Sequence, residues 1–182
     1  DYITLWDLFL VPAYLGLILF LAGRIKRKHI SIYPEFKYFR RGLFLKLMGA
    51  IALSLVYVYY YKGGDTMNYY DGAAALVSMF TYDFEVFWNI MVNNELTYAN
   101  YSVFDTNTGW PHWQLFQSSE TFSVCRFSVL FGFMGLNSFL VMGMLTACFA
   151  YFGIWKLYRL FNMLYPGNAR AFAWTILFMP SM

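Results

Sequence analysis

Several long stretches of the chain carry almost no charged side chains, and this pattern constrains the fold more than any other feature. The charged residues are gathered between these stretches, whereas a soluble protein would scatter them along its helices. Hydrophobic residues make up 60% of the 182 positions and charged residues only 13%, which is more apolar surface than one small core needs. The lipid bilayer is therefore the expected surrounding of the apolar stretches.

The sequence predicts an all-α membrane protein with about three complete transmembrane helices and a truncated fourth. We place these spans at about residues 3–23, 43–61, 136–155 and 171–182. As a helix, the last stretch would rise only about 18 Å, against a hydrocarbon core of about 30 Å. We therefore expect residues 1–182 to be a single membrane-embedded domain and the N-terminal fragment of a longer protein.

The connection between the first two spans is strongly basic, and the next long connection is acidic. Short connections rich in Lys and Arg stay in the cytoplasm. The basic residues between residues 24 and 46 are Arg24, Lys26, Arg27, Lys28, Lys37, Arg40, Arg41 and Lys46. The acids between residues 62 and 126 are Asp65, Asp71, Asp83, Glu85, Glu95, Asp105 and Glu120. We expect residue 1 and the loop 62–126 to lie on the non-cytoplasmic side.

Part of this external loop has the spacing of an amphipathic helix on the membrane surface. Its apolar face consists of Ala73, Leu76, Val77, Phe80, Phe84, Phe87, Trp88 and Met91, and its polar face of Ser78, Thr81, Glu85, Asn89 and Asn93. Residues 93–120 have too few apolar repeats for a helix, so we expect irregular structure there. After Arg126 we expect a short helix to about Met134 and a bend at residues 135–137.

The segment from Gly63 to Asp71 (GGDTMNYYD) holds the candidate catalytic residues. It places Asp65 and Asp71 beside flexible glycines at the mouth of the second span, with Tyr69 and Tyr70 adjacent as candidate substrate-binding residues. Carboxylates in this position could deprotonate a hydroxyl nucleophile on a membrane-bound substrate. The alternative is that Asp65 caps the following helix and that both acids belong to an external surface.

Three further residues are candidates for substrate binding: Arg126, His112 and Trp113. Arg126 could hold a phosphate through paired hydrogen bonds, or it could anchor the chain at the membrane interface. His112 could carry a proton or pack in an aromatic cluster. Trp113, with the other loop aromatics, could stack on a sugar ring or simply lie at the bilayer boundary.

Other functional classes have little support in the sequence. A net charge of +3 without a recognised reading motif argues against nucleic acid as a partner. No Walker loop, dinucleotide fingerprint, zinc pattern, haem motif or nucleophile elbow is present, so no metal ligand is predicted and the cofactor is unknown. Cys125 and Cys148 lie at the two ends of one apolar stretch, which makes a disulfide between them improbable.

The outward span, the segment from Gly63 to Asp71, the amphipathic helix and an aliphatic block ending at Ser181 together resemble multispanning glycosyltransferases of the C superfamily. The resemblance covers residues 43–182 and points to the N-terminal part of the bacterial polysaccharide-polymerase branch. It implies transfer of a sugar or glycan from a polyprenyl phosphate carrier at the external face of a bacterial inner membrane.

In the resemblance, Asp65 is the matching acid, Asp71 is second, and Arg126 is a candidate for holding phosphate. The chain departs from the family in one respect. The acidic loop of the superfamily commonly follows the first span, whereas here it follows the second.

The competing class is a non-catalytic integral membrane subunit, whose acidic and aromatic loop docks to a membrane-protein partner in a larger complex. Whether the chain is an enzyme stays open at this point. A transporter is disfavoured, because no charged residue lies centrally in any predicted span.

Overall fold

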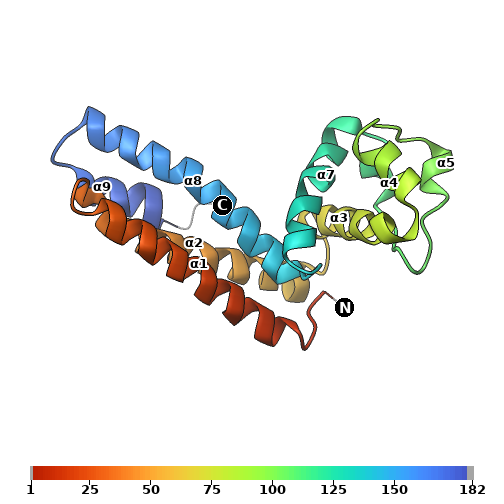
Figure 1. The fold of residues 1–182 in the computed structure, drawn as a ribbon, viewed down its shortest axis with the longest axis horizontal. Coiled ribbons are helices and arrows are strands. Elements are labelled where there is room, and N and C mark those ends of the chain that lie inside the picture. Colours follow the sequence, from red (N-terminus) through yellow and green to blue (C-terminus); the bar gives the residue numbers. More distant parts are fainter. Residues whose placement is uncertain (1, 180–182) are drawn as a thin grey trace. The chain divides into compact units, whose positions relative to one another are not determined.

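The computed structural model describes residues 2–179, which form helices and connecting turns without any strand (Figure 1). In chain order, the elements are α1 (Asp7–His29), η1 (Pro34–Tyr38), α2 (Phe39–Val56), η2 (Tyr57–Tyr61), α3 (Asp65–Tyr82), α4 (Phe84–Met91), α5 (Tyr98–Tyr101), α6 (Trp113–Phe116), α7 (Ser119–Met134), α8 (Phe139–Leu164), α9 (Ala169–Phe172) and η3 (Ala173–Phe178). They divide into two compact units. The first holds residues 3–54 and those from 143 onward, and the second holds residue 2 and residues 55–142.

Among residues 2–179, three helices are long and apolar enough to cross a membrane. They are α1 with 23 residues, the run Pro34–Tyr61 with 28 and α8 with 26, and their mean hydropathies are 2.1, 1.8 and 1.6. A shorter apolar helix follows at Ala169–Phe178, and the last part of the predicted span 171–182 lies outside the described residues. These helices are compatible with an integral membrane protein.

The helices extend further than the predicted spans. The structure continues α1 through the basic residues to His29, whereas the predicted span ends at Gly23. Lys and Arg are good helix formers, and cations are favourable at a helix C-terminus, so the helix need not end where the apolar stretch does. For the same reason α8 passes Lys156 and ends at Leu164.

The core of the first unit is aromatic. Phe39 of α2 packs against Trp155 and Tyr151 of α8, with ring centroids 4.9 and 5.6 Å apart. The Tyr151 hydroxyl donates a hydrogen bond to the Phe39 carbonyl oxygen at 2.7 Å. Gly42 leaves room for this ring, because a Cβ at that position would lie 2.6 Å from the Tyr151 oxygen. Helices α2 and α8 are therefore in direct contact near the start of α2.

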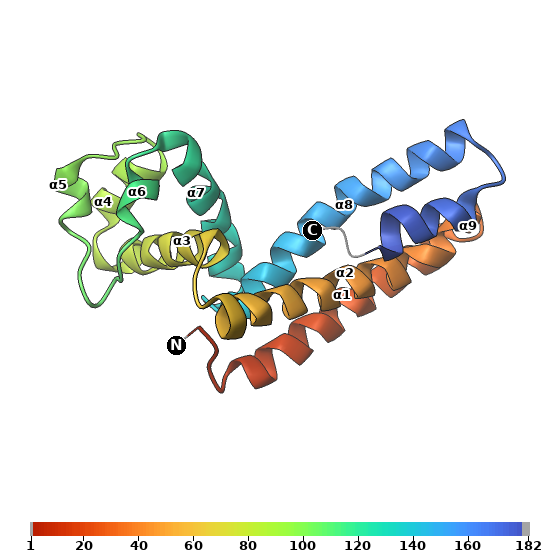
Figure 2. The same ribbon diagram turned by 180° about the vertical axis from the view of Figure 1, so that it is seen from behind.

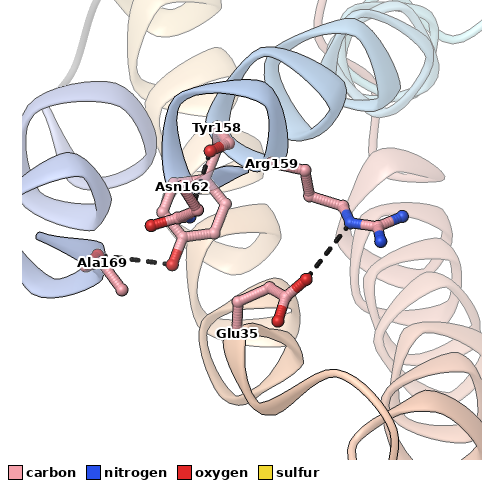
Figure 3. A network of polar contacts seen from close by, with 5 residues as sticks. All are labelled: Glu35, Tyr158, Arg159, Asn162 and Ala169. Carbon is pink, nitrogen blue, oxygen red and sulfur yellow. Dashed lines mark hydrogen bonds and ion pairs between the residues drawn. The ribbon is translucent and has the colours of Figure 1, made fainter. Parts of the chain in front are cut away.

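A polar network joins the end of α8 to its neighbours in the first unit (Figure 3). Arg159 Nε donates to Glu35 Oε1 at 3.3 Å, and the guanidinium lies 4.7 Å from the ring centroid of Tyr33. The hydroxyl of the preceding residue, Tyr158, donates to the carbonyl oxygen of Ala169. The network fixes η1 and α9 against the last turns of α8.

The second unit is built on the packing of α3 against α7, with α4 and α6 beside them (Figures 1 and 2). Glycines allow the two helices to approach closely. A Cβ on Gly72 would lie 2.7 Å from Cys125 Sγ, and a Cβ on Gly132 would lie 2.7 Å from Val77 Cγ2. Small residues at such contacts let helix backbones come together, as they do between membrane helices.

The region of the predicted amphipathic helix contains two helices instead of one. Asp83 interrupts the periodicity, because its carboxylate accepts hydrogen bonds from the backbone N–H groups of Glu85 and Val86 and so begins α4. Buried apolar residues then continue on α4 at Val86, Phe87 and Ile90. A capping residue inside an apolar repeat thus ends one helix and begins another, while the apolar residues keep their helical spacing.

The bend predicted at residues 135–137 is present between α7 and α8. Helix α7 ends at Met134, and Leu136 and Asn137 then adopt left-handed backbone with φ of 52° and 58°. Between residues 93 and 118 only α5 and α6, of four residues each, are helical, as the scarcity of apolar repeats predicted. Helix α7 begins at Ser119, earlier than the helix expected after Arg126.

Candidate active site around Asp71

Asp71 lies on α3 and is half-buried, and its carboxylate is held by a residue from the start of the chain. The Tyr2 hydroxyl donates a hydrogen bond to Asp71 Oδ2 at 2.9 Å. The Tyr2 ring packs against Tyr70 and Phe139, with centroids 5.8 and 5.7 Å apart. These ring contacts fix the position of the hydroxyl, so the carboxylate has a defined orientation.

The surroundings of Asp71 favour its protonated form more than water does. Burial raises the pKa of the Asp71 carboxyl above its ordinary value, while the Tyr2 hydrogen bond and the charge of His112 act in the opposite direction. Burial also raises the pKa of Tyr2 to about 12, and the hydrogen bond to Asp71 adds to this effect. Tyr2 is therefore the proton donor in the pair, and Asp71 is the group that can take up a proton.

Asp71 lies next to the contact between α3 and α7, which its neighbour Gly72 makes with Cys125. Cys125 is fully buried next to Gly72. Burial raises the pKa of the Cys125 thiol to about 12, and the charge of Asp71 contributes in the same direction, while that of Arg126 opposes it. The thiol is thus a packed, neutral group, and Asp71 lies close enough to α7 for its charge to act there.

Asp65 occupies a different position from Asp71. It is exposed in the first turn of α3, where a negative charge is favourable near the helix N-terminus. The cap position belongs to Gly64, whose φ is 118°, and no side chain caps this helix. Six positions along a helix correspond to a rise of about 9 Å and a rotation of about 240°, so Asp65 and Asp71 face different directions.

Arg126 is half-buried on α7, and its side chain is directed back along its own helix. Its Nη2 atom donates to the carbonyl oxygen and hydroxyl of Ser119 and to the hydroxyl of Ser123, at 3.3, 3.4 and 3.1 Å. Nε and Nη1 make no hydrogen bond with the described residues, and Arg126 has no carboxylate partner among residues 2–179. Two donor atoms therefore remain for a phosphate oxygen.

The other predicted residues differ in their surroundings. Tyr70 packs on Tyr2, and its hydroxyl donates to the carbonyl oxygen of Asn137 at 2.7 Å, whereas Tyr69 is half-buried. His112 is exposed, and its charge lowers the pKa of Asp71. Trp113 belongs to an aromatic cluster with Tyr101, at a centroid distance of 4.6 Å.

The structure thus brings Tyr70 and His112 into the neighbourhood of Asp71 and keeps Asp65 and Trp113 in other surroundings. Two residues of the site, Tyr2 and Cys125, are absent from the sequence-based prediction. No local pattern marks them, because Tyr2 lies 69 positions from Asp71 and Cys125 looks like any small residue of an apolar stretch.

Within residues 2–179, no group of three or more His, Cys, Asp and Glu side chains is arranged to hold a metal ion. Comparison with protein-family models, with curated proteins and with solved structures found no match to this chain.

Proposed function

We propose that this chain forms part of a membrane glycosyltransferase that uses a polyprenyl phosphate-linked sugar or glycan as its donor. The observation that carries the proposal is the half-buried carboxyl of Asp71, whose pKa burial raises and which Tyr2 holds in place. A carboxylate with a raised pKa is a stronger base than one in water, and such groups cluster at catalytic sites.

In the proposed reaction, the Asp71 carboxylate accepts the proton of an acceptor hydroxyl group. The hydroxyl oxygen then forms a bond to the anomeric carbon of the donor sugar, and the bond from that carbon to the carrier phosphate breaks. The polyprenyl phosphate leaves with the electron pair. We assign the role of base to Asp71 because its carboxylate is oriented and partly desolvated. Asp65 is the carboxylate at the position that the family resemblance favours.

Arg126 is the proposed phosphate-binding residue. Its Nε and Nη1 atoms are available, and a guanidinium is well suited to two phosphate oxygens. The acceptors Ser119 and Ser123 hold the remaining nitrogen and so fix the plane of the group. Tyr69, Tyr70, His112 and Trp113 stay proposed contacts of the sugar or glycan.

The proposal places this site on the non-cytoplasmic side of a bacterial inner membrane. The last turn of α1 carries Lys26, Arg27, Lys28 and His29, and the following connection is also basic. Such residues favour the cytoplasm, so the second apolar helix would run outward and deliver α3 to the opposite face. A lipid-linked donor exposed at that face can reach the carboxylate.

A second candidate function is supported by the surface of α4. Phe84 and Trp88 are 53% and 48% exposed and line a shallow depression together with Glu85 and Asn89. Large aromatic side chains exposed together are typical of protein interfaces. A non-catalytic membrane subunit could bind a partner protein through this surface.

The two functions are distinguished by the lipid-linked pool in cells that produce the protein. Polyprenyl-linked glycans are extracted from membranes containing the wild type, Asp71→Asn, Asp65→Asn or Arg126→Ala, and are quantified by mass spectrometry. A transferase predicts that the donor accumulates in Asp71→Asn to the level seen without the protein. Glu95→Gln, an exposed acid of the same unit outside that depression, serves as the matched control and should leave the pool unchanged. An identical pool with and without the protein would refute the transferase.

A further inference from the structure

Helix α7 is divided at Arg126 into a polar half and an apolar half. Its first turns contain Ser119, Glu120, Thr121 and Ser123. From Phe127 to Trp155 the sequence has no charged residue at all. The change therefore falls in the middle of a continuous helix and not at one of its ends.

The apolar half carries apolar side chains on both its buried and its outward side, and its one polar residue, Ser128, is half-buried. Val129 and Gly132 are buried, and Gly132 packs against Val77 of α3. The outward side chains of the helix are also large and apolar, with exposed fractions of 57% for Leu130 and 41% for Phe133. The remaining outward members are Phe127 and Met134. A helix that is apolar all round belongs in a protein core or in lipid.

The turn after α7 pairs several of its backbone groups internally. The N–H groups of Gly135, Asn137 and Ser138 donate to the carbonyl oxygens of residues 131, 132 and 135. The carbonyl oxygen of Asn137 accepts from Tyr70, and Ser138 Oγ accepts from the next turn of the chain. The side-chain atom Asn137 Oδ1 is enclosed without a partner. Backbone at membrane depth needs such internal partners, because lipid offers none.

Chain continuity also ties this region to the membrane. The apolar half ends at Met134, and α8, which is long enough to cross a bilayer, begins at Phe139. The four connecting residues reach at most about 14 Å when fully extended. Leu136 at the centre of this turn is 68% exposed although it is apolar. The end of α7 is therefore held near the point where α8 enters the bilayer.

Arg126 has the geometry of an interfacial arginine. Its guanidinium contacts Ser119 and Ser123, which lie toward the polar end of the helix and away from the apolar half. Long basic side chains at a membrane boundary extend in this way toward the headgroups. The direction of the Arg126 side chain and the change in composition along α7 thus place the membrane boundary at the same residue.

We propose that the apolar half of α7, residues 127–134, is embedded in the hydrocarbon of the bilayer, with Arg126 at the level of the lipid phosphates. The occupant of the outward face is lipid, since that face is uncharged and its exposed side chains are large and apolar up to the turn before a membrane-spanning helix. This inference concerns the position of α7 and is independent of the transferase reaction.

The test uses nitroxide spin labels on the full chain, reconstituted in vesicles of phosphatidylethanolamine and phosphatidylglycerol. The labels are attached in a Cys148→Ala background at Phe127→Cys, Leu130→Cys and Met134→Cys. Cys125 is fully buried with a raised pKa and stays unlabelled. Collision rates are measured with oxygen, which enters lipid, and with a water-soluble nickel chelate, which does not.

The matched controls are Glu120→Cys and Ser123→Cys, which are exposed positions on the polar half of the same helix. We expect the nickel chelate to reach Leu130→Cys about tenfold less than Glu120→Cys, because strongly polar groups partition poorly into hydrocarbon. Oxygen collisions should rise from residue 127 to residue 134, which lie about 10 Å apart along the helix.

Two results would overturn the proposal. Equal access of the nickel chelate to residues 120 and 130 would place the apolar half in water. Protection of residues 127–134 from both oxygen and the chelate would mean that protein, and not lipid, covers the face. All labelled positions are exposed, so the substitutions do not disturb the contact with α3. Cys125 is buried in that contact, so its protection from the thiol reagent reports separately on folding.

Discussion

The hydroxyl of Tyr2 and the carboxylate of Asp71 form a 2.9 Å hydrogen bond between residues 69 positions apart in the chain. The bond links the segment before the first apolar helix to a helix that follows the second. Burial and this hydrogen bond act in opposite directions on the pKa of Asp71, and burial is the stronger effect. The Asp71 carboxyl group should therefore contribute to the pH dependence of the protein's stability.

We predict that Asp71 makes the protein less stable as the pH rises through the raised pKa. The folded state binds the proton more tightly than the unfolded state, so the contribution is complete below the ordinary carboxyl pKa of the unfolded chain. It is lost as the pH passes the raised value. Thermal unfolding in detergent micelles at a series of pH values measures this, and Asp71→Asn should flatten that part of the curve. An unchanged pH dependence in Asp71→Asn would contradict the assignment.

Removing the Tyr2 hydroxyl should raise the pKa of Asp71 further. Tyr2→Phe keeps the ring contacts with Tyr70 and Phe139 but removes the donor that stabilises the carboxylate. We expect the pH at which stability falls to move upward, and the acid limb of any transfer activity to move with it. His112→Ala should shift it in the same direction, because the charge of His112 also lowers this pKa. A downward shift in Tyr2→Phe would be inconsistent with the hydrogen bond.

The close approach of α3 and α7 predicts a cost for any side chain at Gly132. The Cβ of Gly132→Ala would lie 2.7 Å from Val77 Cγ2, and a valine in a helix has little freedom to turn away. We expect a loss of about 1–3 kcal/mol in the free energy of unfolding, as for other overpacked contacts. The double variant with Val77→Ala should recover much of it.

The control for this experiment is Gly49→Ala, since nothing lies within 4 Å of a Cβ there. That variant should be neutral or more stable by up to about 1 kcal/mol, because alanine favours a helix interior over glycine. Equal effects at Gly49 and Gly132 would show that the contact with Val77 is not tight.

The network at the end of α8 predicts a modest role for Arg159. Arg159→Ala removes the ion pair with Glu35 and the stacking on Tyr33. Because both charged groups are partly exposed, we expect a loss of about 0.5–1.5 kcal/mol in unfolding free energy. Arg159→Lys should lose less. Lys156→Ala, an exposed cation one turn earlier, is the control, and a loss as large as that of Arg159→Ala would attribute the effect to net charge alone.

The apolar helices and the bend were predictable because they depend on local composition. Long apolar runs with few charges give α1, α2 and α8, and the Gly135–Asn137 segment gives the turn. The interruption at Asp83 was harder to predict, since a side chain that caps a helix does not alter the apolar spacing around it. The apolar runs do not determine where the helices end, because Lys and Arg continue a helix as readily as they flank one.

The candidate site was only partly accessible to prediction. Both acids were named from their place beside glycines at the end of the second span, and the family resemblance put Asp65 first, whereas the structure leaves Asp65 exposed. What separates them is burial and the partner Tyr2, and both depend on contacts between distant parts of the chain. Arg126 was named from its place between a polar and an apolar stretch, while the direction of its side chain required the structure.

Labelling single cysteines with a membrane-impermeant maleimide tests the proposed orientation, on which the external site depends. In a Cys148→Ala background, Thr106→Cys reports on the second unit and Lys28→Cys on the basic connection, and both positions are exposed. The account predicts that Thr106→Cys reacts in intact spheroplasts and that Lys28→Cys reacts only after the membrane is permeabilised. Reaction of Lys28→Cys from outside, with Thr106→Cys protected until permeabilisation, would contradict it.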